Sequence, residues 1–186
     1  LSVGINEYKN ASYNLSYCVN DMKSFADTMQ SISQAIFDHT KIITLKDSQA
    51  SRENILMALD EISNLAQPED VFVFYYAGHG VALDDEDGNV FFFVANKVTQ
   101  MSDLNNCQRF GISGMEMKDK LKAISANKQI SFIDACNSGA FAEQYTLRGP
   151  QIEQSIAKLS RSTGSAIYAS TTSKQTAAEY ETLGHG

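Results

Sequence analysis

Residues 129–139 read QISFIDACNSG, and the rest of the chain is best interpreted from this stretch. The apolar run at residues 130–133 predicts a short buried strand, and Asn-Ser-Gly at 137–139 ends that strand in a loop. Cys136 therefore stands where a buried strand ends. In open α/β sheets, ligands bind at that end of the strands, so this cysteine is a candidate functional residue.

A second stretch has the same design. Residues 71–77 (VFVFYYA) predict another buried strand, and Gly78-His79-Gly80 follows it directly. If the two strands are neighbours in one parallel sheet, His79 and Cys136 meet at the same edge as a thiol nucleophile and its base. The N–H groups of Gly80 and Cys136 would then form an oxyanion hole. The alternatives are a buried structural cysteine and a histidine packed at a glycine turn.

Helices and strands alternate along the chain. We expect helices from about residues 20 to 36, 51 to 66, 113 to 124 and from 150 onward, and strands near residues 1–5, 41–45, 70–77, 90–94, 130–133 and 165–170. The first helix has apolar residues at helical spacing as far as Ile32 and Ile36, and Ser113 with Glu116 forms a capping box. Residues 97–112 are expected to be an irregular loop. The alternation predicts an α/β fold with a mainly parallel central sheet and helices on both faces.

Length and composition narrow the class of protein. The 186 residues suit one domain, and a net charge of −7 argues against nucleic-acid binding, which needs a basic surface. Three cysteines (Cys18, Cys107 and Cys136) lack metal-ligand spacing and favour a reducing, cytoplasmic location without disulfides. No apolar run is long enough to span a membrane. Both ends look cut, so we expect a fragment of a longer polypeptide.

The two strand-end stretches carry a family resemblance. YYAGHG (75–80) and DACNSG (134–139) resemble the histidine and cysteine boxes of the caspase and metacaspase clan of cysteine peptidases. Their His and Cys are 57 residues apart, near the roughly 50 of caspases. VGIN (3–6), Val-Asn-Asp (19–21) and IYAST (167–171) follow in the family's order. The chain is most similar to bacterial caspase-like domains, which are often fused to repeat or sensor modules.

The resemblance implies a three-layer caspase-like fold over residues 1–186, with the N-terminal strand start and the C-terminal small-subunit part missing. It also implies a cysteine endopeptidase with a His79–Cys136 dyad that needs no cofactor for its chemistry. Metacaspases line an acidic S1 pocket with residues that match Asp21 and Asp134. Two carboxylates there favour a protein or peptide substrate with Arg or Lys at P1. The alternative for Asp21 is an ordinary acid at a helix N-terminus.

The resemblance also gives residues 141–164 the place of the linker between large and small subunits. Arg148, Lys158 and Arg161 lie there as candidate self-cleavage sites, although ordinary solvated charges are the simpler interpretation of each.

Two further hypotheses concern regulation. Asp84, Asp85 and Asp87 form an acidic turn that is a weak candidate for Ca²⁺, the activator of many metacaspases. The alternative function for the whole chain is a catalytically silent caspase-like module that acts in partner binding or signalling. A nucleotide-binding switch is excluded because no glycine-rich phosphate loop with a lysine is present.

Overall fold

The computed structural model describes residues 1–86, 88–135 and 166–169. Its strands are β1 (Ser2–Gly4), β2 (Thr44–Lys46), β3 (Val71–Gly78), β4 (Gly80–Asp85), β5 (Gly88–Phe93), β6 (Ile112–Ser113), β7 (Lys128–Ala135) and β8 (Ala166–Ala169). Its helices are α1 (Cys18–Ser33), α2 (Arg52–Leu65), α3 (Leu104–Phe110) and α4 (Gly114–Ala123).

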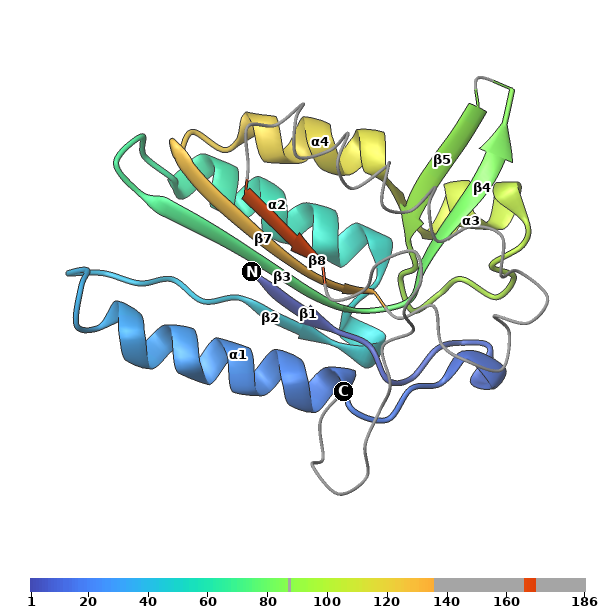
Figure 1. Cartoon of the computed structure of the whole chain (residues 1–186), viewed down its shortest axis with the longest axis horizontal. Helices are drawn as coiled ribbons and strands as arrows, with labels where there is room; N and C mark the ends of the chain where they lie inside the picture. Colours follow the sequence, from blue (N-terminus) through green and yellow to red (C-terminus); the bar gives the residue numbers. More distant parts are fainter. Residues whose placement is uncertain (87, 136–165, 170–186) are drawn as a thin grey trace.

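The central sheet is parallel and has the strand order β2-β1-β3-β7-β8. Helix α1 covers one of its faces, and α2 and α4 cover the other (Figure 1). Tyr75 and Ala77 of β3 pack with α1, whereas Phe74 and Tyr76 belong to the larger core on the opposite face. The predicted α/β fold with helices on both faces is therefore confirmed.

A smaller antiparallel sheet, in the order β4-β5-β6, lies beyond the C-terminal ends of the parallel strands (Figure 1). The strand expected near residues 90–94 is present as β5, which begins earlier, at Gly88. Strand β4 was not predicted: it begins directly after β3 and ends at Asp85, so Asp84 and Asp85 of the expected acidic turn belong to a strand. A single residue, His79, separates the last residue of β3 from the first residue of β4.

The first helix is shorter than predicted. It begins at Cys18 and ends at Ser33, so Ile36 lies beyond it. The side chains of Ile32 and Ile36 are 49% and 66% exposed. Apolar spacing alone overestimated the buried face, since the part of α1 packed on the sheet contributes Cys18, Met22 and Ala26 to the buried core.

The loop expected at residues 97–112 is also wrong in part, because α3 forms within it. Its sequence, LNNCQRF, has no apolar period that would predict a helix. The helix is set instead by its N-cap, Asp103, whose side chain accepts a hydrogen bond from the N–H of Asn105. Cys107 is fully buried and anchors this helix in the core.

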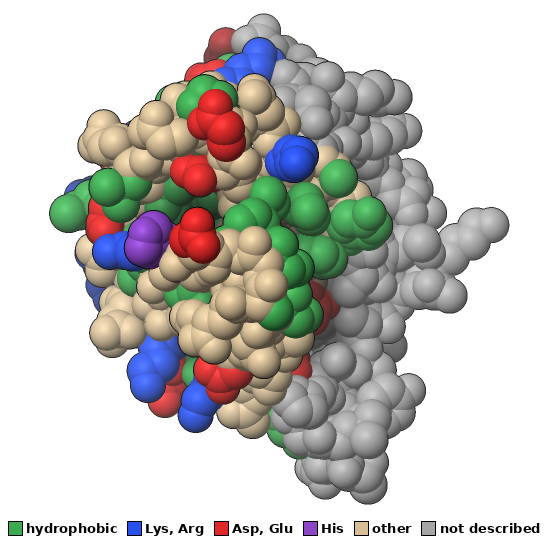
Figure 2. All heavy atoms as spheres, turned by 90° about the vertical axis from the view of Figure 1, so that its left-hand side faces the viewer, with side chains coloured by type: hydrophobic (Ala, Val, Ile, Leu, Met, Phe, Trp, Pro, Cys, Tyr) green, Lys and Arg blue, Asp and Glu red, His purple; other side chains and the backbone are tan. Residues whose placement is uncertain are grey.

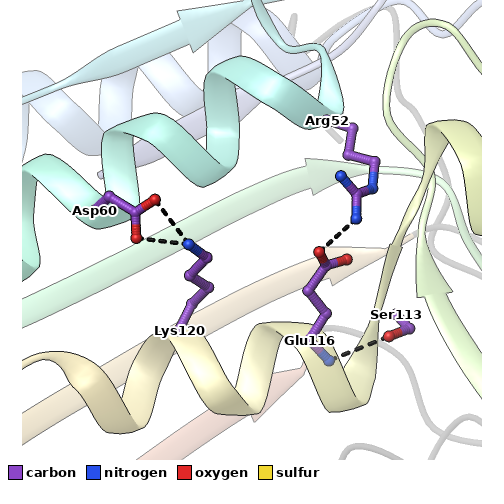
Figure 3. A network of polar contacts seen from close by, with 5 residues as sticks. All are labelled: Arg52, Asp60, Ser113, Glu116 and Lys120. Atoms are coloured by element: carbon purple, nitrogen blue, oxygen red, sulfur yellow. Dashed lines mark hydrogen bonds and ion pairs between the residues drawn. The ribbon is translucent and has the colours of Figure 1, made fainter.

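Helices α2 and α4 are joined by two ion pairs (Figure 3). Lys120 lies 2.6 Å from Asp60, and Arg52 pairs with Glu116. Half of the predicted capping box is confirmed, since the hydroxyl of Ser113 accepts a hydrogen bond from the N–H of Glu116 at 3.1 Å. The carboxylate of Glu116 does not follow the prediction, because it reaches across to α2.

We expect Ser113→Ala to lower the free energy of unfolding by about 1 kcal/mol, the usual cost of losing an N-cap. Urea unfolding would measure the change. Ser102→Ala, at an exposed serine, is the matched control and should leave the stability unchanged. Equal stabilities for the two variants would show that the cap contributes nothing.

The end of the sheet opposite to the small antiparallel sheet is seen in Figure 2. Basic and acidic side chains are interspersed there, so the described part of this face has no basic stripe of the kind that binds nucleic acid. Among the residues that the structure describes, no helix is both long enough and apolar enough to cross a bilayer.

Candidate active site

The backbone of His79 is fixed from three directions at the junction between the two sheets. Its N–H donates a hydrogen bond to the hydroxyl of Tyr8 at 2.9 Å. Its carbonyl oxygen accepts one from the N–H of Val94 at 3.0 Å and another from the hydroxyl of Tyr76 at 2.7 Å. The side chain is 5% exposed. A histidine held in this way has little freedom to move at the strand end.

The imidazole ring is oriented by the backbone of Tyr13. Nε2 of His79 lies 2.8 Å from the carbonyl oxygen of Tyr13. Because a carbonyl oxygen can only accept a hydrogen bond, Nε2 carries the hydrogen and Nδ1 carries the basic lone pair of the neutral ring. This arrangement suits a general base, because one nitrogen holds the ring while the other can take a proton.

The last residues of β3 and β7 lie side by side. Gly78 is paired with Ala135, so the residues immediately before His79 and Cys136 are register partners in neighbouring parallel strands. A Cβ atom placed on Gly80 would lie 3.2 Å from the Cβ of Ala135 and 2.8 Å from the ring of Phe91. The turn after β3 is therefore packed directly against the end of β7. Cys136 itself lies outside the described residues.

The backbone N–H of Gly80 points away from the antiparallel ladder. Gly80 of β4 is the register partner of Phe93 of β5. The hydrogen bond next to this pair runs from the N–H of Val94 to the carbonyl of His79. In this pattern Gly80 and Phe93 form a non-hydrogen-bonded pair. The N–H of Gly80 is thus directed out of the ladder, as an oxyanion-hole donor would have to be.

The N-terminus of α1 lies at the same edge of the sheet. Gly4 ends β1, and a Cβ atom placed on it would lie 2.6 Å from the carbonyl oxygen of Cys18 and 2.7 Å from the Cβ of Met22. Glycine is needed at this position because the first turn of α1 approaches the strand so closely. Asp21, in that first turn, is therefore carried to the C-terminal edge of the parallel strands.

Asp134 faces the side of the sheet that α1 covers. Phe25 of α1 and Phe132 of β7 are in ring contact, with centroids 5.1 Å apart. Asp21 lies about one helical turn before Phe25 in α1, a step of about 5.4 Å along the helix. Asp134 lies two residues after Phe132 in β7, a step of about 6.6 Å along the strand. Both steps lead from the ring contact toward the same edge. The two carboxylates predicted to line one pocket thus share a face and an edge.

Several predicted site residues lie outside the described residues. They are Asp87, Arg148, Lys158, Arg161 and the linker at 141–164. Asp84 and Asp85 are described, at the end of β4. Within residues 1–86, 88–135 and 166–169, no three His, Cys, Asp or Glu side chains are grouped so that they could hold a metal ion. The calcium hypothesis stays a prediction, because Asp87 is not among these residues.

The two other cysteines lie in the core of the protein. Cys18 and Cys107 are buried and form no disulfide. Burial, with a smaller contribution from nearby Asp103, raises the pKa of the Cys107 thiol to about 12. Its Sγ lies 3.6 Å from the carbonyl oxygen of Met101. A thiol of this kind is almost fully protonated at neutral pH and is a poor nucleophile.

The sequence did not reveal the tyrosines around His79. Tyr8 and Tyr13 lie in the polar turn after β1, 71 and 66 residues from the histidine. One contact uses the backbone carbonyl of Tyr13, and the rings of Tyr8 and Tyr13 lie near the imidazole with centroids 5.0 Å and 6.3 Å from it. Contacts of these kinds could not be deduced from residue type. The available signal was the presence of two aromatic residues in an otherwise polar turn.

Comparisons with known proteins agree with this fold. Metacaspase-1 of Debaryomyces hansenii is 26% identical over 171 residues, covering 85% of this chain and 37% of the relative. Metacaspase-1 of Meyerozyma guilliermondii is 36% identical over 93 residues, which are 48% of this chain and 22% of the relative. The chain thus spans about two fifths or less of the length of these curated relatives.

A solved structure and a family model complete the comparison. The crystal structure of protein GSU0716 from Geobacter sulfurreducens matches with a TM-score of 0.57 at 17% identity, covering 88% of this chain and 60% of that one. At this identity the likeness concerns the fold alone. The model of the caspase domain matches residues 1–186. Because that match extends along the whole sequence, the chain belongs to the caspase-domain family of peptidases.

Proposed function

We propose that this chain is a cysteine endopeptidase that cleaves peptide bonds after Arg or Lys. The observation that supports the proposal is the pairing of Gly78 with Ala135, because strands β3 and β7 therefore end side by side at one edge of the sheet. His79 is the residue after β3, and Cys136 is the residue after β7. Membership of the caspase-domain family and the metacaspase relatives support the same chemistry.

The proposed reaction uses the tautomer that Tyr13 favours. Nδ1 of His79 takes the proton of the Cys136 thiol, and the thiolate attacks the scissile carbonyl carbon. The N–H groups of Gly80 and Cys136 stabilise the negative charge on the tetrahedral oxygen. The imidazolium then gives its proton to the leaving amine, and an acyl-enzyme remains. Water, activated by the neutral imidazole, hydrolyses the thioester and restores the thiol.

The proposed specificity rests on Asp21 and Asp134. A basic P1 side chain would enter beside α1 and lie between the two carboxylates. Coulomb attraction would be stronger there than in water, because the neighbouring rings of Phe25, Tyr75 and Phe132 make the surroundings of the two carboxylates more apolar. A basic residue in the linker at 141–164 would fit the same pocket, so self-processing at Arg148, Lys158 or Arg161 belongs to the proposal.

Covalent trapping tests the nucleophile. We expect a peptidyl-arginine chloromethyl ketone to alkylate Cys136 of the full-length protein, with loss of chloride, and mass spectrometry of the digest to locate the adduct. Cys107 is a control within the same molecule, because its raised pKa should keep it unmodified until the protein unfolds. Modification of Cys107 or Cys18 before Cys136 would contradict the assignment of the nucleophile.

A further inference from the structure

Two tyrosine hydroxyls bind the backbone of His79. The N–H of His79 donates to the hydroxyl of Tyr8 at 2.9 Å, and the hydroxyl of Tyr76 donates to the carbonyl of His79 at 2.7 Å. The hydroxyl of Tyr76 also lies 3.1 Å from the carbonyl oxygen of Val94. Both polar groups of the His79 backbone are therefore held by a tyrosine hydroxyl, and we refer to Tyr8 and Tyr76 as the tyrosine pair.

The tyrosine pair is buried and leaves no space for other groups. Tyr8 is 6% exposed and Tyr76 is 1% exposed. A Cβ atom on Gly78 would lie 2.8 Å from the hydroxyl oxygen of Tyr8 and 2.9 Å from that of Tyr76. The two hydroxyls thus occupy the space that a side chain at this position would need. A backbone group of His79 that lost its tyrosine partner would stay buried and unsatisfied, which is costly.

The Tyr8 phenol keeps its hydrogen at neutral pH. Burial raises the pKa of Tyr8 well above its ordinary value, and the neighbouring Tyr76 adds to this effect. Tyr8 is accordingly a neutral hydroxyl that accepts the hydrogen bond from the N–H of His79.

The same chain segment also orients the imidazole. The hydroxyl of Tyr8 binds the backbone of His79, and the ring of Tyr8 packs against the imidazole in a tilted arrangement, with centroids 5.0 Å apart. Tyr13, five residues later, supplies the carbonyl that holds Nε2. The segment is itself fixed, because the N–H of Tyr8 donates to the side-chain oxygen of Asn14 and the N–H of Lys9 donates to the carbonyl of Asn96.

We propose that Tyr8 and Tyr76 are positioning residues, which hold His79 in the orientation that catalysis requires. This inference rests on the proposed function, in which His79 is the base. The phenols touch no reacting atom and act through the backbone of the histidine. Without either hydroxyl the histidine would lose a fixed backbone contact, and the productive orientation of its ring would be populated for less of the time.

The test compares Tyr8→Phe and Tyr76→Phe with the wild type. Each variant removes one oxygen and keeps the ring. Tyr168→Phe is the matched control, since Tyr168 is 60% exposed and lies on β8. Turnover of an arginyl peptide gives kcat and KM, and ¹⁵N NMR of the imidazole gives the tautomer of His79. The chain has only three histidines, so loss of a signal in His79→Ala identifies the correct resonance.

We expect Tyr8→Phe and Tyr76→Phe each to lower kcat about tenfold with KM changed less than twofold, because substrate binding does not involve the phenols. The double variant should lose less than the product of the two single effects, since both hydroxyls hold the backbone of the same residue. The Nε2–H tautomer should dominate in the wild type and lose population in both variants. Wild-type kcat together with a wild-type tautomer in Tyr8→Phe and Tyr76→Phe would overturn the proposal.

A measurement on the wild type covers the case in which the variants do not fold. The amide of His79 should exchange with deuterium as slowly as amides in the middle of β3, because its acceptor is buried. Exchange as fast as that of an exposed loop amide would overturn the proposal, because the bond to Tyr8 would then not hold the histidine. A failure of the proposed function is recognised separately, as an absence of both turnover and ketone labelling in the wild type. The NMR and exchange results report on the contacts of the tyrosine pair alone.

Discussion

Turnover is expected to fall by roughly 10⁴-fold or more when Cys136 is replaced by alanine, while the fold stays intact. The expected effect is large because the thiolate forms a covalent bond to substrate, and no other group can substitute for it. His79→Ala should have a comparable effect, and the double variant should be little worse than either single one, because the two residues act as a unit. Peptide hydrolysis by the purified full-length variants measures all three effects.

Matched controls separate the dyad from general damage. Cys107→Ala removes a buried thiol whose raised pKa makes it a poor nucleophile, and His39→Ala removes an exposed histidine. Both should retain the wild-type kcat. Peptidase activity that persists in Cys136→Ala would contradict the mechanism, and loss of activity in Cys107→Ala without unfolding would show that the wrong cysteine had been assigned.

Selectivity for Arg and Lys should be lost when either pocket carboxylate is neutralised. Asp134→Asn and Asp21→Asn are each expected to reduce kcat/KM for an arginyl peptide by about 10- to 100-fold, the range of a charge-assisted hydrogen bond of roughly 1.5–3 kcal/mol. Hydrolysis of a peptide with a neutral P1 residue should change little. Comparing the two substrates measures the selectivity directly.

Asp27→Asn is the control for net charge. Asp27 is exposed on the same helix as Asp21, and its replacement changes the formal charge of the chain by the same amount. It should leave the preference for arginine intact. If Asp27→Asn and Asp134→Asn reduced the preference equally, the effect would come from the overall acidity of the protein and not from a pocket.

The sequence predicts the framework of this site well, because strands that are buried on both faces have a clear signature. The apolar runs before His79 and Cys136 predicted two strands, and the structure confirms that these strands are neighbours. The structure also explains the glycines that flank the histidine. Gly78 meets two hydroxyls and Gly80 meets an aromatic ring, so both positions exclude a side chain.

The contacts that hold the histidine could not be predicted in the same way. The bond between Nε2 of His79 and the carbonyl of Tyr13 uses a backbone atom, which every residue has, so no residue type indicates it. The ends of α1 depended on which apolar residues reach the sheet, and Ile32 remains half exposed because the sheet does not cover it. Local periodicity contains no information about either feature.

The most direct test of the central claim is a panel of fluorogenic peptides that differ only at P1, assayed with the full-length protein and its Cys136→Ala variant, with and without Ca²⁺. The account predicts hydrolysis of the Arg and Lys peptides by the wild type alone, in at least one of the two calcium conditions. Preference for Asp at P1 would contradict the acidic pocket formed by Asp21 and Asp134. Equal hydrolysis by the wild type and Cys136→Ala would contradict the claim that this chain is a cysteine peptidase.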